Sequence, residues 1–332
     1  MSRPISRMIS LSLGLMASVA VLAGPAHAVD GTLTLYTSQP NTDAQQSIDA
    51  FMQAYPDVKV TFVRDGTTKI MAKLEAELAA GSTPADVLLI ADSVTMEGLK
   101  ARDLLMAHDG ADTSAYAEGT HDADKTWFGT KLITTGIMYN TAASMVPASW
   151  NDLLSEEAKG QIAMPSPLTS GAALIHTATL VGNLEAGWGY YEDLAANGAQ
   201  ASGGNGGVLK QVAGGEKLYG MVVDFLPIRE KAKGAPVAFV FPEEGVSAIS
   251  EPVAILASTQ NADAAKAFVD FLISKEGQEL ALSQGYLPAH PEVAVPAGFP
   301  DRSTIKVMPF DAAKALAEAD SNKARFAEIF GQ

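Results

Sequence analysis

The sequence predicts an α/β protein of two lobes with a ligand cleft between them. From residue 32 to residue 102, strand-like and helix-like segments alternate, which is typical of a parallel sheet covered by helices. Segment 86–90 is apolar at almost every position, as a strand that is buried on both faces requires. Two long β-like runs, 127–139 and 247–256, are long enough to cross from one lobe to the other.

The expected elements follow one another without an internal repeat or a long linker. Strands are expected at 32–37, 58–63, 86–90, 127–139, 159–164, 218–223, 238–241 and 247–256. Helices are expected at 43–55, 66–80, 93–102, 150–154, 169–181, 188–197, 208–213, 227–233, 262–274, 275–284, 311–317 and 322–330.

The two long crossings divide the chain into a discontinuous lobe and a continuous lobe. We expect the first lobe to comprise 29–130 and 253–300, and the second lobe to comprise 131–252. Residues 301–332 are expected to form a helical tail that packs on this body. In an open α/β sheet, a ligand binds at the carboxyl ends of the strands, so the cleft is expected there.

Residues 1–28 have the pattern of a secretory signal peptide. Two arginines precede an apolar stretch at about 9–23, and an Ala-His-Ala sequence ends at Ala28. The apolar stretch is too short to span a bilayer as a helix. We expect cleavage after Ala28, so that the mature chain begins at Val29 in the periplasm without a direct membrane insertion.

Composition excludes several function classes. The net charge of −15 argues against partners such as nucleic acid or an anionic membrane surface, and favours a soluble monomer. With no cysteine in the chain, thiolate metal sites and thiol nucleophiles are excluded. The sequence also contains no phosphate-binding loop, no zinc-ligand spacing and no catalytic Ser/His/Asp arrangement. We therefore expect neither enzymatic activity nor a cofactor nor a bound metal.

Several fragments, each of modest specificity, together form a specific pattern. They are 35–38 (Leu-Tyr-Thr-Ser), 83–88 (Thr-Pro-Ala-Asp-Val-Leu), 136–140 (Gly-Ile-Met-Tyr-Asn), 147–154, 166–172, 220–224, 271–278 and 285–288. In their order and spacing the chain resembles the type II periplasmic solute-binding proteins of ABC importers. The branch that it resembles includes ferric-iron, hexose-phosphate and 2-aminoethylphosphonate binders, and the resemblance to the last of these is closest.

The resemblance implies a two-lobed type II periplasmic binding protein. Such a protein captures a small solute and delivers it to an inner-membrane ABC permease and its ATPase. We expect a phosphorylated or phosphonate solute, with 2-aminoethylphosphonate as the first choice and a hexose phosphate as the alternative. A receptor that presents its solute to a sensory membrane protein is a second functional class that the sequence leaves open.

The resemblance argues against ferric iron as the solute. The four ligand positions of the iron binders align here with residues that offer no donor side chain for a hard cation: Pro40, Ala91, Phe225 and Leu226. Another tyrosine pair, Tyr190 and Tyr191, could substitute for the missing ligands, but it is expected to pack in the core, because it lies in an aromatic and leucine-rich helix start.

Two predicted helix starts indicate an anion site. At one, Ser170, Gly171 and Ala172 combine a hydroxyl with helix N-terminal N–H groups, and the family places an anion there. The alternative is an ordinary N-cap without a ligand. A second glycine-rich start offers Asn205 and Gly206, and the end of the first strand offers Ser38; both are further candidates.

Three acidic residues are candidates for the opposite end of the ligand. Asp224 and Asp92 each follow a predicted strand on the ligand side, and Glu244 precedes the second crossing. They are expected to meet an amine or sugar hydroxyl groups, although each could also be a surface charge or a helix cap. Phe225, next to Asp224, is a candidate apolar wall. An anion site together with these carboxylates describes a zwitterionic ligand.

Overall fold

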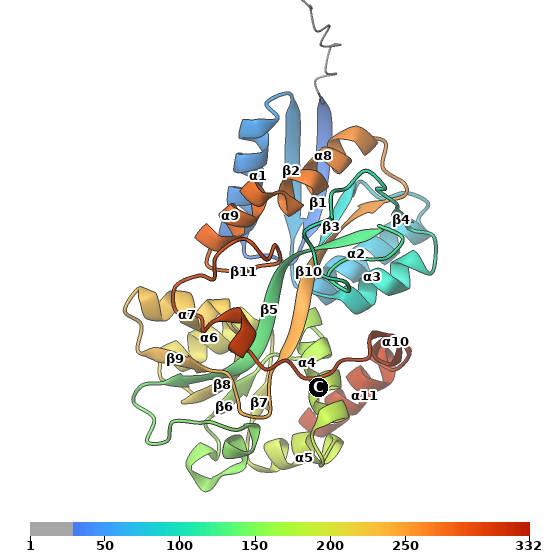
Figure 1. Ribbon diagram of the computed structural model, residues 1–332. Helices are drawn as coiled ribbons and strands as arrows, with labels where there is room; N and C mark the ends of the chain where they lie inside the picture. Colours follow the sequence, from blue (N-terminus) through green and yellow to red (C-terminus); the bar gives the residue numbers. More distant parts are fainter. Residues whose placement is uncertain (1–28) are drawn as a thin grey trace, which may run out of the picture.

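The computed structural model describes residues 29–332 and confirms the α/β class (Figure 1). Two lobes, upper and lower in Figure 1, are joined by the long strands β5 (Trp127–Asn140) and β10 (Ser247–Leu256). The predicted signal peptide and its cleavage position lie outside the described residues. The predicted lobe boundaries at 130, 252 and 300 stay predictions.

The upper lobe holds the first elements of the chain and two later helices. Its strands are β1 (Gly31–Thr37), β2 (Val58–Arg64), β3 (Val87–Leu89), β4 (Leu105–Met106) and β11 (Leu287–Pro288). Its helices are α1 (Asn41–Ala54), α2 (Thr67–Ala79), α3 (Ser93–Lys100), α8 (Ala262–Ile273) and α9 (Lys275–Ser283).

The lower lobe holds the middle of the chain, and the last two helices lie beside it (Figure 1). Its strands are β6 (Ile162–Met164), β7 (Gln200–Ala201), β8 (Tyr219–Val223) and β9 (Val237–Val240). Its helices are α4 (Gly171–Asn183), α5 (Trp188–Ala196), α6 (Asn205–Ala213) and α7 (Phe225–Ala232), followed at the chain end by α10 (Ala312–Ala317) and α11 (Ala319–Phe330).

One mixed sheet runs through both lobes, in the order β2-β1-β3-β10-β5-β8-β6-β7. The first three strands are parallel, as the alternating pattern predicts. β10 then pairs antiparallel with both β3 and β5, because the two crossings run in opposite directions between the lobes. All three residues of β3 are fully buried, which confirms that this apolar strand is covered on both faces.

The ladder between the two crossing strands contains an irregularity at Glu251. The register of β10 against β5 shifts between Ser250 and Pro252, where the single residue Glu251 of β10 lies opposite two residues of β5, Thr130 and Lys131. A β-bulge leaves its extra residue outside the regular ladder, and here the extra residue belongs to β5. Lys131 and Glu251 thus lie beside one another at the level where the two lobes meet.

Most element boundaries agree with the predictions within a few residues, and three kinds of difference remain. The helix α6 begins at Asn205 rather than at 208, since Gly206 and Gly207 weaken the helical pattern of its first turn. Segment Trp150–Leu154 is a 3-10 helix, not an α-helix. The strands β4, β7 and β11 have two residues each, too few to show a two-residue alternation.

The two lobes have separate apolar cores. Phe51 and Phe268 pack edge to face in the upper lobe, with ring centroids 4.9 Å apart. In the lower lobe Tyr191 packs against Phe326 of α11, with centroids 5.7 Å apart, so the last helix is attached to this lobe. The helix α10 packs on α3 of the upper lobe, so the C-terminal segment contacts both lobes.

Candidate ligand-binding site

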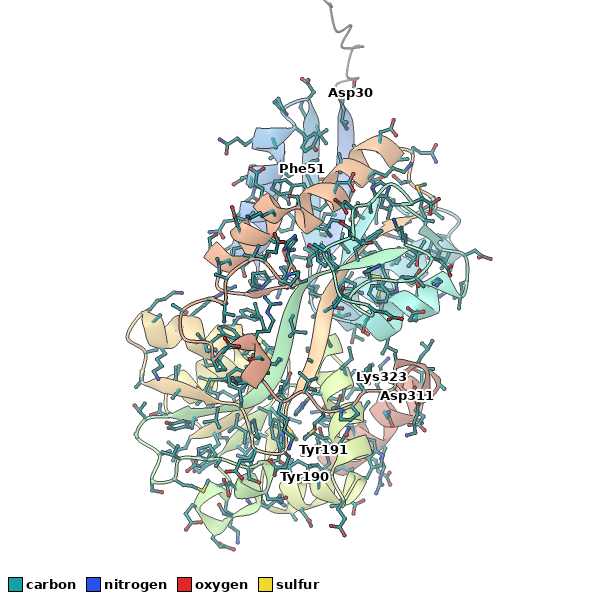
Figure 2. The ribbon with its side chains drawn as sticks, viewed as in Figure 1. Asp30, Phe51, Tyr190, Tyr191, Asp311 and Lys323 are labelled. Atoms are coloured by element: carbon teal, nitrogen blue, oxygen red, sulfur yellow. The ribbon has the colours of Figure 1, made fainter. Side chains whose placement is uncertain are left out.

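A cavity of about 460 Å³ lies between the lobes, where the carboxyl ends of β1, β2 and β3 face the N-termini of α4 and α6. Its lining comes from both lobes: Ser38, Gln39, Pro40, Arg64, Asp65, Gly66, Thr67, Lys69, Ala91, Ile133, Thr169, Ser170, Ala172, Gly203–Gly207, Val223, Phe225, Leu226, Glu251 and Tyr286. A larger hollow of about 810 Å³ is lined by upper-lobe residues alone, among them Asp30 and Asp270. Asp30 lies at the outer end of that lobe (Figure 2). The smaller cavity is therefore the candidate site for a ligand that both lobes enclose.

The anion end of the cavity forms around Ser170 and Asn205. Ser170 is the N-cap of α4, and its Oγ accepts from the Ala173 N–H at 3.3 Å and from Asn205 Nδ2 at 3.2 Å. Asn205 in turn accepts from the Val223 N–H through Oδ1, at 3.1 Å. Within residues 29–332, the first two N–H groups of α4 and of α6, at 171–172 and 205–206, donate to no backbone carbonyl, so this end of the cavity offers N–H donors to an anion.

Five of the six predicted anion-site residues line the cavity: Ser38, Ser170, Ala172, Asn205 and Gly206. The sixth, Gly171, lies behind the wall, where the backbones of the two lobes approach closely. A Cβ atom on Gly171 would lie 2.7 Å from the Ala91 carbonyl oxygen, and one on Gly66 would lie 2.6 Å from that of Thr169. Both glycines therefore permit a contact between the lobes that no larger residue would allow.

Two cations that the sequence analysis did not assign to the site, Arg64 and Lys69, line the opposite wall. The Arg64 Nε–H donates to the Gln39 carbonyl at 2.7 Å, which fixes the direction of an otherwise exposed side chain. The two glycine-rich helix starts contain no Arg or Lys, but the end of β2 and the first turn of α2 supply Arg64 and Lys69 from the other lobe. The sequence signal for Arg64 was its position at the carboxyl end of a strand, where the cleft was expected.

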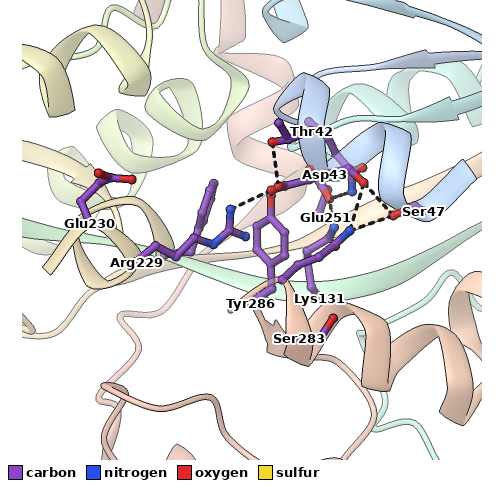
Figure 3. Close-up of polar contacts among 12 residues, drawn as sticks. Thr42, Asp43, Ser47, Lys131, Arg229, Glu230, Glu251, Ser283 and Tyr286 are labelled. Carbon is purple, nitrogen blue, oxygen red and sulfur yellow. Dashed lines mark hydrogen bonds and ion pairs between the residues drawn. The ribbon is translucent and has the colours of Figure 1, made fainter. Parts of the chain in front are cut away.

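A buried group of charges forms the floor of the cavity. Glu251 and Lys131 are each 3% exposed, and their side chains form an ion pair of 2.8 Å between the two crossing strands (Figure 3). Gln39 Nε2 donates to the same Glu251 carboxylate at 2.9 Å. Within residues 29–332, the buried Gln39 Oε1 atom has no hydrogen-bond partner. The floor therefore holds a buried acceptor that the described protein leaves unpaired.

The three acids predicted to meet an amine do not line the cavity. Asp224 is fully buried and accepts from the Thr134 N–H and hydroxyl, at 2.9 and 2.7 Å, and from the Phe225 N–H at 2.7 Å. It therefore ties β8 to β5. Burial raises the pKa of Asp224 to about 6. A strand end fixes where a residue lies, but here the side chain turns into the protein, so the geometry does not support the predicted ligand role.

The other two acids are also held by protein donors. Asp92 caps α3 by accepting from the Thr95 N–H at 3.0 Å, and burial raises the pKa of its carboxyl. Glu244 accepts from the Ser149 hydroxyl and, at 3.3 Å, from the Trp150 N–H. Both therefore have the cap-like roles that the sequence left as alternatives, whereas Phe225, the predicted apolar wall, lines the cavity.

The four positions aligned with iron ligands all line the cavity: Pro40, Ala91, Phe225 and Leu226. Tyr190 and Tyr191 lie in the lower-lobe core, remote from that lining (Figure 2). The Tyr190 hydroxyl donates to the Trp150 carbonyl at 2.8 Å. The predicted packing role of this pair is therefore confirmed. Among residues 29–332, no group of three or more His, Cys, Asp or Glu side chains is arranged to hold a metal ion.

Among residues 29–332, no helix combines the length and the apolar composition that crossing a membrane requires.

Residues 82–316 match the family model described as bacterial extracellular solute-binding protein. An uncharacterized protein of Haemophilus influenzae is 32% identical over 295 residues, covering 83% of this chain and 82% of the relative. An Fe(3+)-binding periplasmic protein of Serratia marcescens is 25% identical over 280 residues, with coverages of 81% and 82%. A putative 2-aminoethylphosphonate-binding periplasmic protein of Salmonella typhimurium is 25% identical over 284 residues, covering 80% of each chain.

Among solved structures, the periplasmic binding protein AfuA of Actinobacillus pleuropneumoniae, with fructose-6-phosphate bound, superposes with a TM-score of 0.83. It is 25% identical, and the match covers 90% of this chain and 98% of that one.

Proposed function

The chain belongs to the bacterial extracellular solute-binding protein family and is the periplasmic solute-binding component of an ABC importer; we propose that its solute is a phosphate monoester of a small hydroxylated compound. The observation that carries the proposal is the anion end of the cavity. There the N-termini of α4 and α6, with Ser170 and Asn205, face Arg64 and Lys69. Hydrogen-bond donors on one wall and cations on the other suit a phosphoryl group.

The floor of the cavity supports a hydroxylated body for the solute. Gln39 Oε1 is a buried acceptor without a partner in the described chain, and a sugar hydroxyl would satisfy it. The Glu251 carboxylate already balances the charge of Lys131, so it suits a neutral donor better than a second cation. The volume of about 460 Å³ lies within the usual range of small-molecule sites. The AfuA complex, with a hexose phosphate, supports the same class.

A second candidate is 2-aminoethylphosphonate. Asp65 lines the cavity opposite the glycine-rich loop and offers a carboxylate to an ammonium group. However, the Asp65 side chain is 48% exposed and lies 3.6 Å from Lys69. Solvent and the Lys69 charge therefore both weaken its attraction for an ammonium group. The name of the Salmonella relative favours 2-aminoethylphosphonate. Asp224, the carboxylate expected to bind its amine, does not line the cavity, which weakens this candidate.

Calorimetry on refolded, solute-free protein separates these candidates. We expect glucose 6-phosphate to bind more tightly than 2-aminoethylphosphonate, inorganic phosphate or glucose. Glucose that binds as well as its phosphate would contradict the anion end. Tight ferric binding, with a tyrosinate absorption band, would overturn the proposal as a whole.

Charge variants test which cation contacts the solute. Arg64→Gln should weaken glucose 6-phosphate binding about tenfold and flatten its salt dependence, because a charge-assisted hydrogen bond is lost. Lys59→Gln is the matched control, since Lys59 is exposed on the same strand and does not line the cavity. Equal effects of the two variants would show that Arg64 acts through the overall positive charge of the strand and not through a direct contact with the solute.

A further inference from the structure

The lobes meet at a second polar cluster beside the cavity. Asp43 lies in the first turn of α1 in the upper lobe, and Arg229 lies on α7 in the lower lobe (Figure 3). The Arg229 Nη1 atom lies 2.8 Å from Asp43 Oδ2, and the two side chains are 19% and 7% exposed. Neither residue lines the cavity, so this ion pair bridges the lobes without contacting the solute directly.

Arg229 has one charged partner and two aromatic neighbours. Its guanidinium carbon lies 4.5 Å from the Phe225 ring centroid and 4.3 Å from that of Tyr286. Within residues 29–332, its buried Nε and Nη2 atoms have no hydrogen-bond partner. A guanidinium in this position depends on its carboxylate, because the rings stabilise its charge by a smaller amount.

Asp43 is held in place from its own lobe. The Tyr286 hydroxyl donates to Asp43 Oδ2 at 2.5 Å, and the Thr42 hydroxyl donates to Oδ1 at 3.2 Å. Both donors come from the upper lobe, since Tyr286 follows α9 directly. The Asp43 carboxylate is thus oriented by donors of its own lobe as well as by Arg229.

Two residues connect the pair to the cavity. Phe225 comes from the lower lobe and Tyr286 from the upper lobe, their ring centroids are 4.4 Å apart, and both line the cavity. The rings that Arg229 contacts are therefore cavity walls. When the lobes separate, this aromatic contact and the ion pair must break together.

We propose that Asp43 and Arg229 are a latch that stabilises the closed arrangement of the lobes and sets how slowly the bound solute leaves. The pair contributes to the closed state alone, because its members belong to different lobes. The apparent affinity scales with the population of the closed state, so residues remote from the solute change it. The latch rests on solute binding in this cavity, and not on the identity of the solute.

Kinetics with glucose 6-phosphate test the latch. Arg229→Met keeps the apolar stem against the rings and removes the charge. We expect the dissociation rate to rise about 10- to 100-fold with an almost unchanged association rate. Lys233→Met is the matched control, because Lys233 is exposed and pairs with Glu230 in its own lobe. An effect confined to the association rate, or equal in both variants, would overturn the latch.

A double-mutant cycle assigns the effect to the pair. In an Asp43→Asn background, Arg229→Met should change the dissociation rate by less than threefold, because the ion pair is already lost. If the two effects instead multiply in full, Arg229 acts through the rings alone and the latch is wrong.

A solute-free measurement separates the latch from the proposed function. The chain has no cysteine, so dyes on Lys59→Cys and Lys231→Cys, both exposed and in different lobes, report the distance between the lobes. Arg229→Met should lower the closed population without solute. The same population in both proteins overturns the latch, whereas failure of glucose 6-phosphate to bind overturns only the proposed solute.

Discussion

The two ends of the cavity are built in different ways. The anion end consists of helix N-termini, small side chains and the glycine-rich loop Gly203–Gly207, much of it accessible from solvent. The floor consists of Gln39, Lys131 and Glu251, which are almost fully buried and bonded to one another. The first end can exchange a ligand for water at little cost to the fold. The floor cannot lose Lys131 or Glu251 without leaving a buried charge unpaired.

Lys131→Met should have the largest effect on stability. It leaves the Glu251 carboxylate buried without its cation, and breaking one partner of such a pair costs about 3–5 kcal/mol of unfolding free energy. Denaturant titration measures the loss. The double variant Lys131→Met, Glu251→Leu should recover most of the stability, and solute binding should still be impaired. No recovery in the double variant would contradict the assignment.

Asp224 should produce a pH-dependent effect of about 3 kcal/mol. Its pKa is about 6 in the folded protein, against an ordinary value of 3.8. Between these values the folded state keeps a proton that the unfolded state releases, so the contribution of Asp224 to stability falls as pH rises from about 4 to about 6. The unfolding free energy of Asp224→Asn should lack this decline, and parallel pH profiles for the two proteins would contradict it.

Ser170→Ala should have the smallest effect and should act on stability and binding together. Loss of the N-cap bond to the Ala173 N–H costs about 1 kcal/mol of stability. Loss of the hydroxyl in the cavity should weaken glucose 6-phosphate about three- to tenfold by calorimetry. Ser274→Ala removes an equivalent cap, to the Gly277 N–H of α9, away from the cavity. Ser274→Ala should lower the unfolding free energy by a similar amount and leave the affinity for glucose 6-phosphate unchanged.

The anion end could be predicted from the sequence because its chemistry is local. A serine before a helix start and an asparagine between glycines indicate their roles within a few residues. The floor could not be predicted in this way. Lys131 and Glu251 are 120 positions apart by their numbers, and only the pairing of β5 with β10 brings them together. The sequence signal for this ion pair was that each long β-like run contains one charged residue.

The same distinction explains the misplaced acids. Asp224 follows β8 as predicted, but whether its carboxylate faces the cavity depends on the Thr134 donors of a neighbouring strand. Arg64 was overlooked for the converse reason, because it contributes from the other lobe. Local sequence patterns predicted where helices start and where strands end. The direction in which a side chain points could be determined only once the strands were assembled into a sheet.

The glycines at 66 and 171 also limit how such a receptor can evolve. A Cβ atom at either position would lie 2.6 to 2.7 Å from a carbonyl oxygen of the other lobe. Every descendant that keeps this contact between the lobes must therefore keep glycine at both positions. The exposed wall residues Arg64 and Lys69 carry no such constraint. Descendants can therefore acquire new solutes by changing the walls, while the two positions that let the walls meet stay as they are.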